Sequence, residues 1–402
     1  MVEKIKNLSN KSLEYLFLTT LLLFPISIAL RNILLGLLLI FYLFNKIINK
    51  DFSLPKTFLN KYILLFFVFS LLSFINTNNI QASLDTLLSP IFRYIAFFIM
   101  AYEIINNKKI ARYIKILISG GFLVLIIGHY IDYFTKGSFF YRNNEFGATA
   151  AMLIIFFVSI LLSYDNKLFK GISFFGLILS INAIVISYSR GATLGLLAAI
   201  FVMVFIYIWI KFSLVNKKIA VILIVSFISL FLILTPFILP DRLIDRFKNT
   251  NFNYNTNPRL LMWRTTLEMI KKHPVFGAGL GTFNSHFLYN VDNVFEGAKL
   301  SAVNRKHEKP HNLYLFIASE QGIPSLIIYL LMLYLSFKLA ILNFIKDFSH
   351  KGNFLSLTLL GFLTQVFIHS FVDTSVLYGQ IGLYVIIFLI FNAKFNKERS
   401  CK

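Results

Sequence analysis

The chain has 402 residues, of which 57% are hydrophobic and only 14% are charged, and its formal net charge is +21. Soluble domains usually carry about 25% charged residues, so this composition excludes an ordinary soluble enzyme or binding module. A single cysteine, Cys401, excludes an intramolecular disulfide and any metal site built on several cysteines.

Apolar runs long enough to cross a membrane recur along almost the whole chain. A spanning helix needs about 20 predominantly apolar residues. The candidate spans are, in chain order, residues 13–30, 33–49, 58–76, 86–105, 112–134, 146–163, 171–189, 192–212, 218–239, 312–337, 353–372 and 376–393. The first follows several lysines, as a signal peptide would, but no small-residue cleavage site comes after it, so we interpret it as a retained helix. The sequence predicts an all-α, polytopic membrane protein with about twelve transmembrane helices.

The basic residues are distributed unevenly between the two sides of these spans. With the N-terminus inside, the inner segments hold most Lys and Arg, whereas the short outer loops hold only Arg31, Lys136, Arg142 and Arg190. This is the positive-inside pattern, and it predicts that both termini are cytoplasmic. The excess of positive charge is therefore mostly a topology signal, and we expect no nucleic-acid partner.

One connection, residues 240–310, is long and hydrophilic and is predicted on the outer face, where its basic residues outnumber its acidic ones. A basic surface there suits anionic lipid headgroups or a phosphorylated substrate; a solvated loop with ordinary charges is the alternative. The stretch "NPRLLMWRTTLEMIKKHP" predicts an amphipathic helix, with Asn257 as N-cap and Pro258 in the first position. Arg259 lies in the first turn, where a cation does not favour the helix dipole. This position indicates another role for Arg259.

The stretch "GAGLGTF" places glycines at 277, 279 and 281. No strand is predicted before it and the spacing is not that of a dinucleotide fingerprint. The pattern favours a tight turn with positive φ angles over a nucleotide site.

Several charged residues lie close to the predicted membrane. Arg190, in "SYSRGATLG", is either an interfacial anchor or a fixed outer cation that binds phosphate. Arg93 lies deeper, as a further site residue or as a buried partner of an acid. Asp373, in "HSFVDTSV", pairs with an arginine, orients a histidine or ends a helix. His369 lies one turn earlier, and such a histidine is more often a packed polar contact than a ligand.

The stretch "HEKPH" spells the H-E-x-x-H of zinc proteases, with His307 and His311 as ligands. Both must lie one turn apart on a continuous helix, and Pro310 in a helix interior costs about 3 kcal/mol. We therefore expect the helix to begin at Pro310, which leaves His307 outside it and disfavours a metalloprotease. His311 remains either a structural histidine or a general base beside cations.

Three segments together resemble the O-antigen ligase family: "SYSRGATLGLL", "NPRLLMWRTTLEMIKKHPVFGAGLGTF" and "KPHNLYLFIASEQGIPSLIIYL". O-antigen polymerases and O-oligosaccharyltransferases share the domain. The resemblance implies a multi-span helical glycosyltransferase without metal, nucleotide or other cofactor, located in the bacterial inner membrane with its large loop in the periplasm. It implies transfer of a glycan from undecaprenyl diphosphate to a sugar hydroxyl of lipid A–core. The alternatives are a polymerase, a protein O-oligosaccharyltransferase and a lipid or glycan transporter.

The resemblance also implies residue roles. Arg190 and Arg259 would hold the diphosphate and His311 would activate the acceptor hydroxyl, while Asp373 and Arg142 match the family more loosely. We expect N-terminal transmembrane helices over 1–139, a ligase-like region over 140–393 and a cytoplasmic tail over 394–402.

Overall fold

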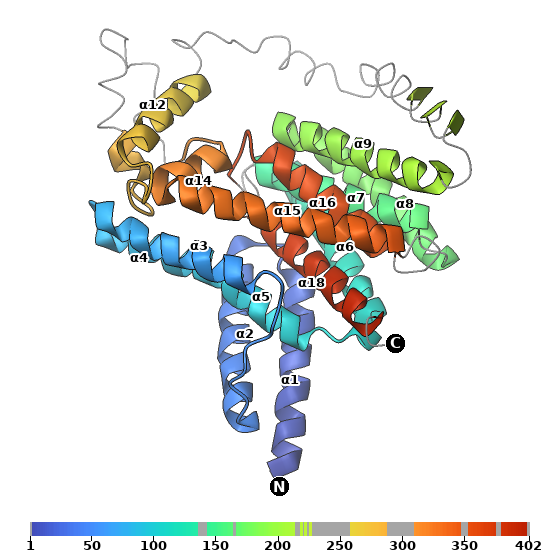
Figure 1. Cartoon of the computed structure of the whole chain (residues 1–402). Helices are drawn as coiled ribbons and strands as arrows, with labels where there is room; N and C mark the ends of the chain where they lie inside the picture. Colours follow the sequence, from blue (N-terminus) through green and yellow to red (C-terminus); the bar gives the residue numbers. More distant parts are fainter. Residues whose placement is uncertain are drawn as a thin grey trace.

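A computed structural model describes residues 2–135, 143–163, 166–213, 258–287, 309–346, 353–374 and 379–399, and three residue pairs between 218 and 226. Every regular element within these residues is helical, as predicted (Figure 1). The first half contains α1 (Val2–Leu23), α2 (Ile28–Asn49), α3 (Asn60–Leu72), η1 (Ser73–Asn76), α4 (Ile80–Thr86), η2 (Leu87–Phe92), α5 (Arg93–Ile104), η3 (Asn107–Lys109) and α6 (Ile110–Thr135). The second half contains α7 (Asn143–Ser163), α8 (Lys167–Ser187), α9 (Arg190–Ser213), α12 (Pro258–Lys272), α14 (Leu313–Gln321), α15 (Ile323–Lys346), α16 (Asn353–His369) and α18 (Ile381–Arg399).

Seven helical stretches among the described residues are long and apolar enough to cross a membrane. They are Ile28–Asn49, Ile80–Ile104, Asn107–Gly128, Asn144–Ser163, Lys167–Ser187, Arg190–Ile210 and Ile323–Lys346. Three shorter apolar helices add to them, at Asn60–Asn76, Asn353–His369 and Ile381–Lys394. The chain is therefore a multi-pass membrane protein. The predicted span at 218–239 lies almost wholly outside the described residues.

Two predicted boundaries were wrong. Arg31 was expected in an outer loop, but it lies in the first turn of α2, where it is only 1% exposed. The predicted span 312–337 is two helices, because Gly322 takes φ +87° between α14 and α15. Only α15 has the length and hydropathy of a membrane-crossing helix, and α14 precedes it as a short separate element.

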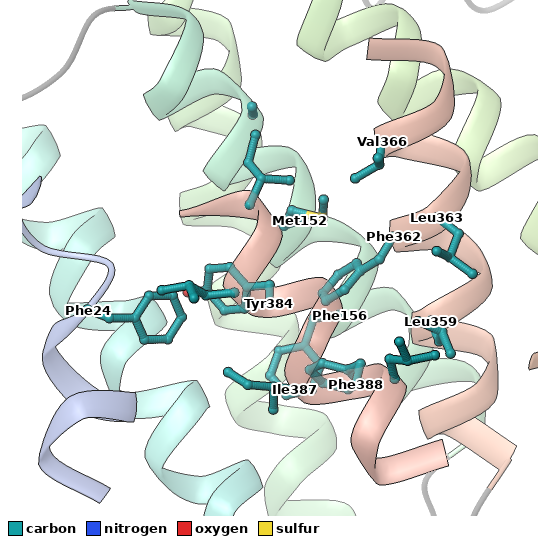
Figure 2. Packing of buried hydrophobic residues seen from close by; sticks show 14 of the residues in the cluster. Phe24, Met152, Phe156, Leu359, Phe362, Leu363, Val366, Tyr384, Ile387 and Phe388 are labelled. Atoms are coloured by element: carbon teal, nitrogen blue, oxygen red, sulfur yellow. The ribbon is translucent and has the colours of Figure 1, made fainter. Parts of the chain in front are cut away.

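The core is centred on α7 and α16. In the apolar stretch of α7 that is long enough to cross the membrane, 78% of the residues are buried inside the protein. The corresponding share for α15 is 22%. Aromatic rings from α7, α16 and α18 meet there: the Phe388 ring lies 5.2 Å from that of Phe156 and 5.0 Å from that of Phe362, both edge-on (Figure 2). Because α16 is covered on nearly all sides, its C-terminal end is held in a fixed position.

α9 packs closely on α16 because it presents glycines one turn apart. A Cβ atom on Gly191 would lie 2.6 Å from a methyl carbon of Val372 and 2.8 Å from the His369 ring. A Cβ atom on Gly195 would overlap the Gln365 amide. Small residues spaced in this way allow membrane helices to approach at the backbone. The first turn of α9 therefore lies against the end of α16, which brings Arg190 to that end.

Candidate functional site

A small polar pocket, about 40 Å³ in volume, lies where α9, α12 and α16 meet the start of α7. Its lining includes Arg190, Arg259 and Asp373, which come from three separate parts of the chain. In Figure 1, α12 and α14 lie on the side of the molecule away from the N-terminus. Two predicted cations and one predicted carboxylate thus share one cavity. The other lining residues are Asn144, Tyr188, Ser189, Gly191, His369 and Val372.

Asn144 joins two of the segments that form the pocket. Its Nδ2 donates to Oδ2 of Asp373 at 3.0 Å, and its Oδ1 accepts from Oγ of Ser189 at 3.1 Å. The first bond ties the start of α7 to the segment after α16, and the second ties it to the turn between α8 and α9. Asp373 is 9% exposed, so this amide bond helps to satisfy a largely buried carboxylate.

The turn between α8 and α9 determines where Arg190 lies. Tyr188 ends α8 with φ 48°, in the left-handed region, and Ser189 follows. Gly191 is not part of this turn: it lies inside α9 and allows the close packing on α16. Arg190 is the first residue of α9.

Arg259 is the second residue of α12, as the Asn-Pro start predicted. The indole Nε1 of Trp263, one turn further along α12, donates to the carbonyl oxygen of Pro310 at 2.9 Å. This bond fixes the helix that carries Arg259 against the residue before His311.

His311 lies beside the pocket but is not part of its lining. Its φ angle is +50°, which is unusual for a residue with a side chain and costs on the order of 1 kcal/mol. The conformation is held on both sides: Pro310 is bonded to Trp263, and the amide of Leu313 donates to the carbonyl of Ser370 at 2.8 Å. Ser370 follows His369 of the pocket wall, so His311 is anchored next to that wall.

The expected helix start at Pro310 was wrong. α14 begins at Leu313, and Asn312 is its N-cap, with Oδ1 accepting from the amide of Leu315 at 3.0 Å. An asparagine side chain satisfies an amide of the first turn, which the proline ring does not do. His311 therefore precedes the helix, at a bend in the chain.

Two predicted supporting residues are not in the pocket. Arg93 donates through Nη1 to Oδ1 of Asn32 at 2.7 Å, and its guanidinium carbon lies 5.6 Å from the centre of the Tyr94 ring. This hydrogen bond goes to an amide, not to an acid. Arg142 lies outside the described residues, and so does His307 of the "HEKPH" stretch.

Within the described part of the chain, no group of three His, Cys, Asp or Glu side chains is placed to hold a metal ion. The pocket offers one carboxylate and one imidazole beside two guanidinium groups. Guanidinium groups repel cations and bind phosphate or carboxylate through paired N–H donors. The chemistry of this pocket is that of an anion site.

Sequence reasoning missed Asn144, and it favoured a packed polar contact for His369. His369 is 1% exposed, lines the pocket and lies within electrostatic reach of Arg259 and Asp373. The spacing of Gly191 and Gly195 was the available signal, because it predicts a close helix contact beside Arg190. Nothing in the sequence showed that α16 was the partner.

Residues 175–330 match the family model described as O-antigen ligase. This part of the chain is similar to the O-antigen ligase family. The matched part covers less than half of the chain; it includes Arg190, Arg259 and His311 and leaves out Asn144 and Asp373. No curated protein matches the chain. Members of this family are membrane enzymes of the glycosyltransferase type that act on polyisoprenyl-linked glycans.

A larger cavity, about 200 Å³ in volume, lies between α3, α5, α15, α16 and α18. Its lining is almost entirely hydrocarbon, with Tyr94, Tyr329 and Ser336 as the polar members, and contains no charged residue. It offers no acid, base or cation for group transfer, so the smaller polar pocket is the site to which we assign chemistry.

Proposed function

We propose that this protein belongs to the O-antigen ligase family and transfers an O-antigen glycan from undecaprenyl diphosphate to a sugar hydroxyl of lipid A–core, at the periplasmic face of the inner membrane. The observation that carries the proposal is the shared pocket of Arg190, Arg259 and Asp373. Arg190 and Arg259 lie in the first turns of two helices, and helix N-termini add partial positive charge to such a site.

The charge of the pocket suits a leaving diphosphate. Arg190 and Arg259 supply two positive charges and Asp373 one negative charge, which leaves a positive excess when His369 is neutral. As the bond between the anomeric carbon and the phosphate oxygen breaks, its electron pair passes to the diphosphate and negative charge grows there. Cations already in place stabilise this change without further reorganisation. Each charge-assisted contact contributes on the order of 1.5–3 kcal/mol.

His311 is the proposed general base. The acceptor hydroxyl oxygen attacks the anomeric carbon, its proton passes to the imidazole, and the diphosphate leaves. The position of His311 beside the pocket wall supports this assignment, since the attacking and leaving groups lie on opposite sides of the reacting carbon. Direct attack of this kind inverts the anomeric centre. No covalent enzyme intermediate, metal or nucleotide is part of the proposal, because the diphosphate is already an activated leaving group.

The proposed partners are both lipid-borne. Positive-inside asymmetry supports cytoplasmic termini and a periplasmic loop at 240–310, and α12 of that loop brings Arg259 to the pocket. On this topology the donor and the acceptor approach through the outer leaflet, a face of the membrane that has no ATP.

Gene deletion followed by gel analysis of lipopolysaccharide tests the proposal. Loss of a ligase leaves bare core together with polymer still bound to its carrier. Core carrying a single repeat unit would instead indicate a polymerase, which joins carrier-linked repeats within the same family. Unchanged lipopolysaccharide would refute both activities.

Purified protein provides the direct test. In liposomes with undecaprenyl diphosphate-linked glycan and lipid A–core, we expect labelled glycan to appear on the acceptor. Arg190→Ala and Arg259→Ala should abolish this transfer while membrane insertion is retained. Movement of the donor across the bilayer with no new glycosidic bond would identify a transporter instead.

A further inference from the structure

The "GAGLGTF" turn, residues 277–283, does not line the pocket, yet it makes a dense set of contacts with the end of α14. The amide of Ala278 donates to the Ser319 carbonyl at 2.8 Å, and that of Gly279 donates to the Glu320 carbonyl at 3.1 Å. The amide of Phe283 donates to Oε1 of the Glu320 side chain at 3.1 Å. The last carbonyls of a helix have no partner within it, and this turn supplies partners for two of them.

Glycine is required in this turn, as the sequence indicated. Gly277, Gly279 and Gly281 all have positive φ angles. A Cβ atom on Gly277 would also overlap the main chain of Glu320. Gly277 therefore allows the turn to lie directly on α14, whereas a Cβ atom on Gly279 or Gly281 would overlap residues of the η1–α4 region.

A third segment holds the turn from the other side. Nδ2 of Asn76 donates to the Gly277 carbonyl at 2.7 Å, and Oγ of Ser83 donates to the Leu280 carbonyl at 2.7 Å. Residues from the η1–α4 region are thus bonded to the 277–283 turn, which is bonded in turn to α14. The Glu320 carboxyl group takes part in this contact through the Phe283 amide.

Glu320 is only 1% exposed, and its second oxygen, Oε2, has no hydrogen-bond partner among the described residues. Burial raises the pKa of Glu320 to about 7, against an ordinary value of 4.5, although the amides of Gly281 and Phe283 and the charge of Lys309 oppose the shift. A buried carboxyl group with an unpartnered oxygen favours the protonated form.

α12 and α14 are consequently joined at both ends. At one end Trp263 is bonded to Pro310, next to Arg259 and His311. At the other end the amide of Ile323 donates to the Pro274 carbonyl at 2.8 Å, beside the turn that Glu320 holds. Trp263 and Pro274 are 11 positions apart in the chain, which corresponds to about 16 Å at the helical rise. A change in the angle between the helices at the Glu320 end would displace the residues at the other end.

We propose that Glu320 is a positioning residue for glycan transfer: its carboxyl group clamps the 277–283 turn to α14 and thereby sets the position of Arg259 relative to His311. The inference rests on the proposed function, but the clamp itself can be measured without any glycan.

The clamp is expected to depend on pH. In the folded protein the proton of Glu320 is retained up to about pH 7, whereas in the unfolded chain it is lost near 4.5. The stabilising contribution is therefore complete at low pH and is lost as the pH rises through 7. Among the described residues, Lys309 is a charged group that acts on Glu320. The titratable side chains nearest to the turn in sequence are His273 and His286, whose ring centres are 5.9 Å apart.

Glu320→Gln and Glu320→Ala distinguish the clamp from a general loss of structure. The Gln side chain still offers an oxygen to the Phe283 amide and never ionises, whereas Ala offers none. Glu268→Gln is the matched control, because Glu268 contacts Lys271 on the exposed face of α12. All variants are made in the full-length protein and assayed in liposomes with undecaprenyl diphosphate-linked glycan and lipid A–core.

The first measurement is hydrogen exchange of the 277–283 amides at pH 6. We expect Glu320→Ala to accelerate exchange about tenfold or more, since it removes a hydrogen bond to a buried amide. Glu320→Gln and the Glu268→Gln control should resemble the wild type. Unchanged exchange in Glu320→Ala would overturn the clamp, whether or not the wild-type protein transfers glycan. Absence of transfer by the wild-type protein would refute the proposed function and would leave the exchange result unaffected.

The second measurement is the pH profile of transfer. At pH 6, Glu320→Gln should keep its kcat within about threefold of the wild type, and Glu320→Ala should lose about tenfold or more. Above pH 7.5 the wild type should decline while Glu320→Gln does not. Equal losses in both variants at pH 6, or identical alkaline limits in the wild type and Glu320→Gln, would overturn the positioning role.

Discussion

Asn144 offers the sharpest test of the pocket, because replacing its amide nitrogen with an oxygen turns a hydrogen-bond donor into a negative charge. Its amide donates to Oδ2 of Asp373 at 3.0 Å. Asn144→Asp is nearly isosteric and replaces that donor with a second carboxylate. The substitution keeps the shape of the pocket and changes its charge.

The magnitude follows from the distance. Two unit charges 3.0 Å apart repel by about 5 kcal/mol at an effective dielectric constant of about 20. Relaxation and proton uptake reduce this energy, and we expect about 3 kcal/mol to remain, equivalent to roughly a hundredfold loss in transfer rate. The new carboxylate also opposes the diphosphate directly. Asn144→Ala only removes hydrogen bonds and should cost less, about 1–2 kcal/mol.

The assay is transfer of labelled glycan between defined lipid-linked substrates in liposomes, with insertion checked by size-exclusion chromatography. Asn49→Asp is the control. Asn49 is the last residue of α2 and bonds to Asn10 and Asn45, none of which lines the pocket. The expected order of kcat/KM is wild type and Asn49→Asp, then Asn144→Ala, then Asn144→Asp. Full activity in Asn144→Asp would refute the idea that this pocket binds a developing anion.

Three further predictions address the base, the turn and the absence of metal. His311→Ala should lower kcat by about a hundredfold or more with little change in donor KM, as for loss of a general base. His369→Gln should mainly raise donor KM. The reverse pattern would transfer the base role to His369. Gly277→Ala should lower the midpoint of thermal unfolding by several degrees, because a methyl group there overlaps the neighbouring helix. Gly171→Ala is the control and should leave the midpoint unchanged, since nothing lies within 4 Å of its Cβ position. Equal midpoints in the two variants would contradict the close contact. Chelators should leave transfer unchanged, and inhibition that added zinc reverses would revive a metal-dependent mechanism.

Local chemistry was sufficient for several elements. The Asn-Pro start of α12 and its apolar spacing gave a helix that begins at Pro258, as predicted. The glycines of "GAGLGTF" gave a turn with positive φ angles. Long apolar runs gave a multi-pass membrane protein. In each case the determining interaction lies within a few residues, so the sequence contains it.

Features set by distant partners were not predicted. The break at Gly322 depends on the 277–283 turn and on Pro274, whose carbonyl accepts from the Ile323 amide. The position of Asn144 in the pocket depends on Ser189 and Asp373, 45 and 229 residues away. Hydrophobic periodicity describes one helix at a time. It does not specify which helix covers which face, and the pocket is made of such contacts.

The two pocket arginines occupy positions that are unfavourable for helix stability. A cation in the first turn of a helix opposes the macrodipole by about 0.3–1 kcal/mol. Both Arg190 of α9 and Arg259 of α12 occupy such positions, and both helix starts meet at one cavity. Helix stability alone would favour an acidic or capping residue at these sites. A bound anion reverses the balance, because it interacts favourably with the guanidinium groups and with the helix ends at once. On the proposed function, arginine at two converging N-termini lowers the stability of the empty protein and raises its affinity for a diphosphate, most of all when the negative charge of the ligand is growing.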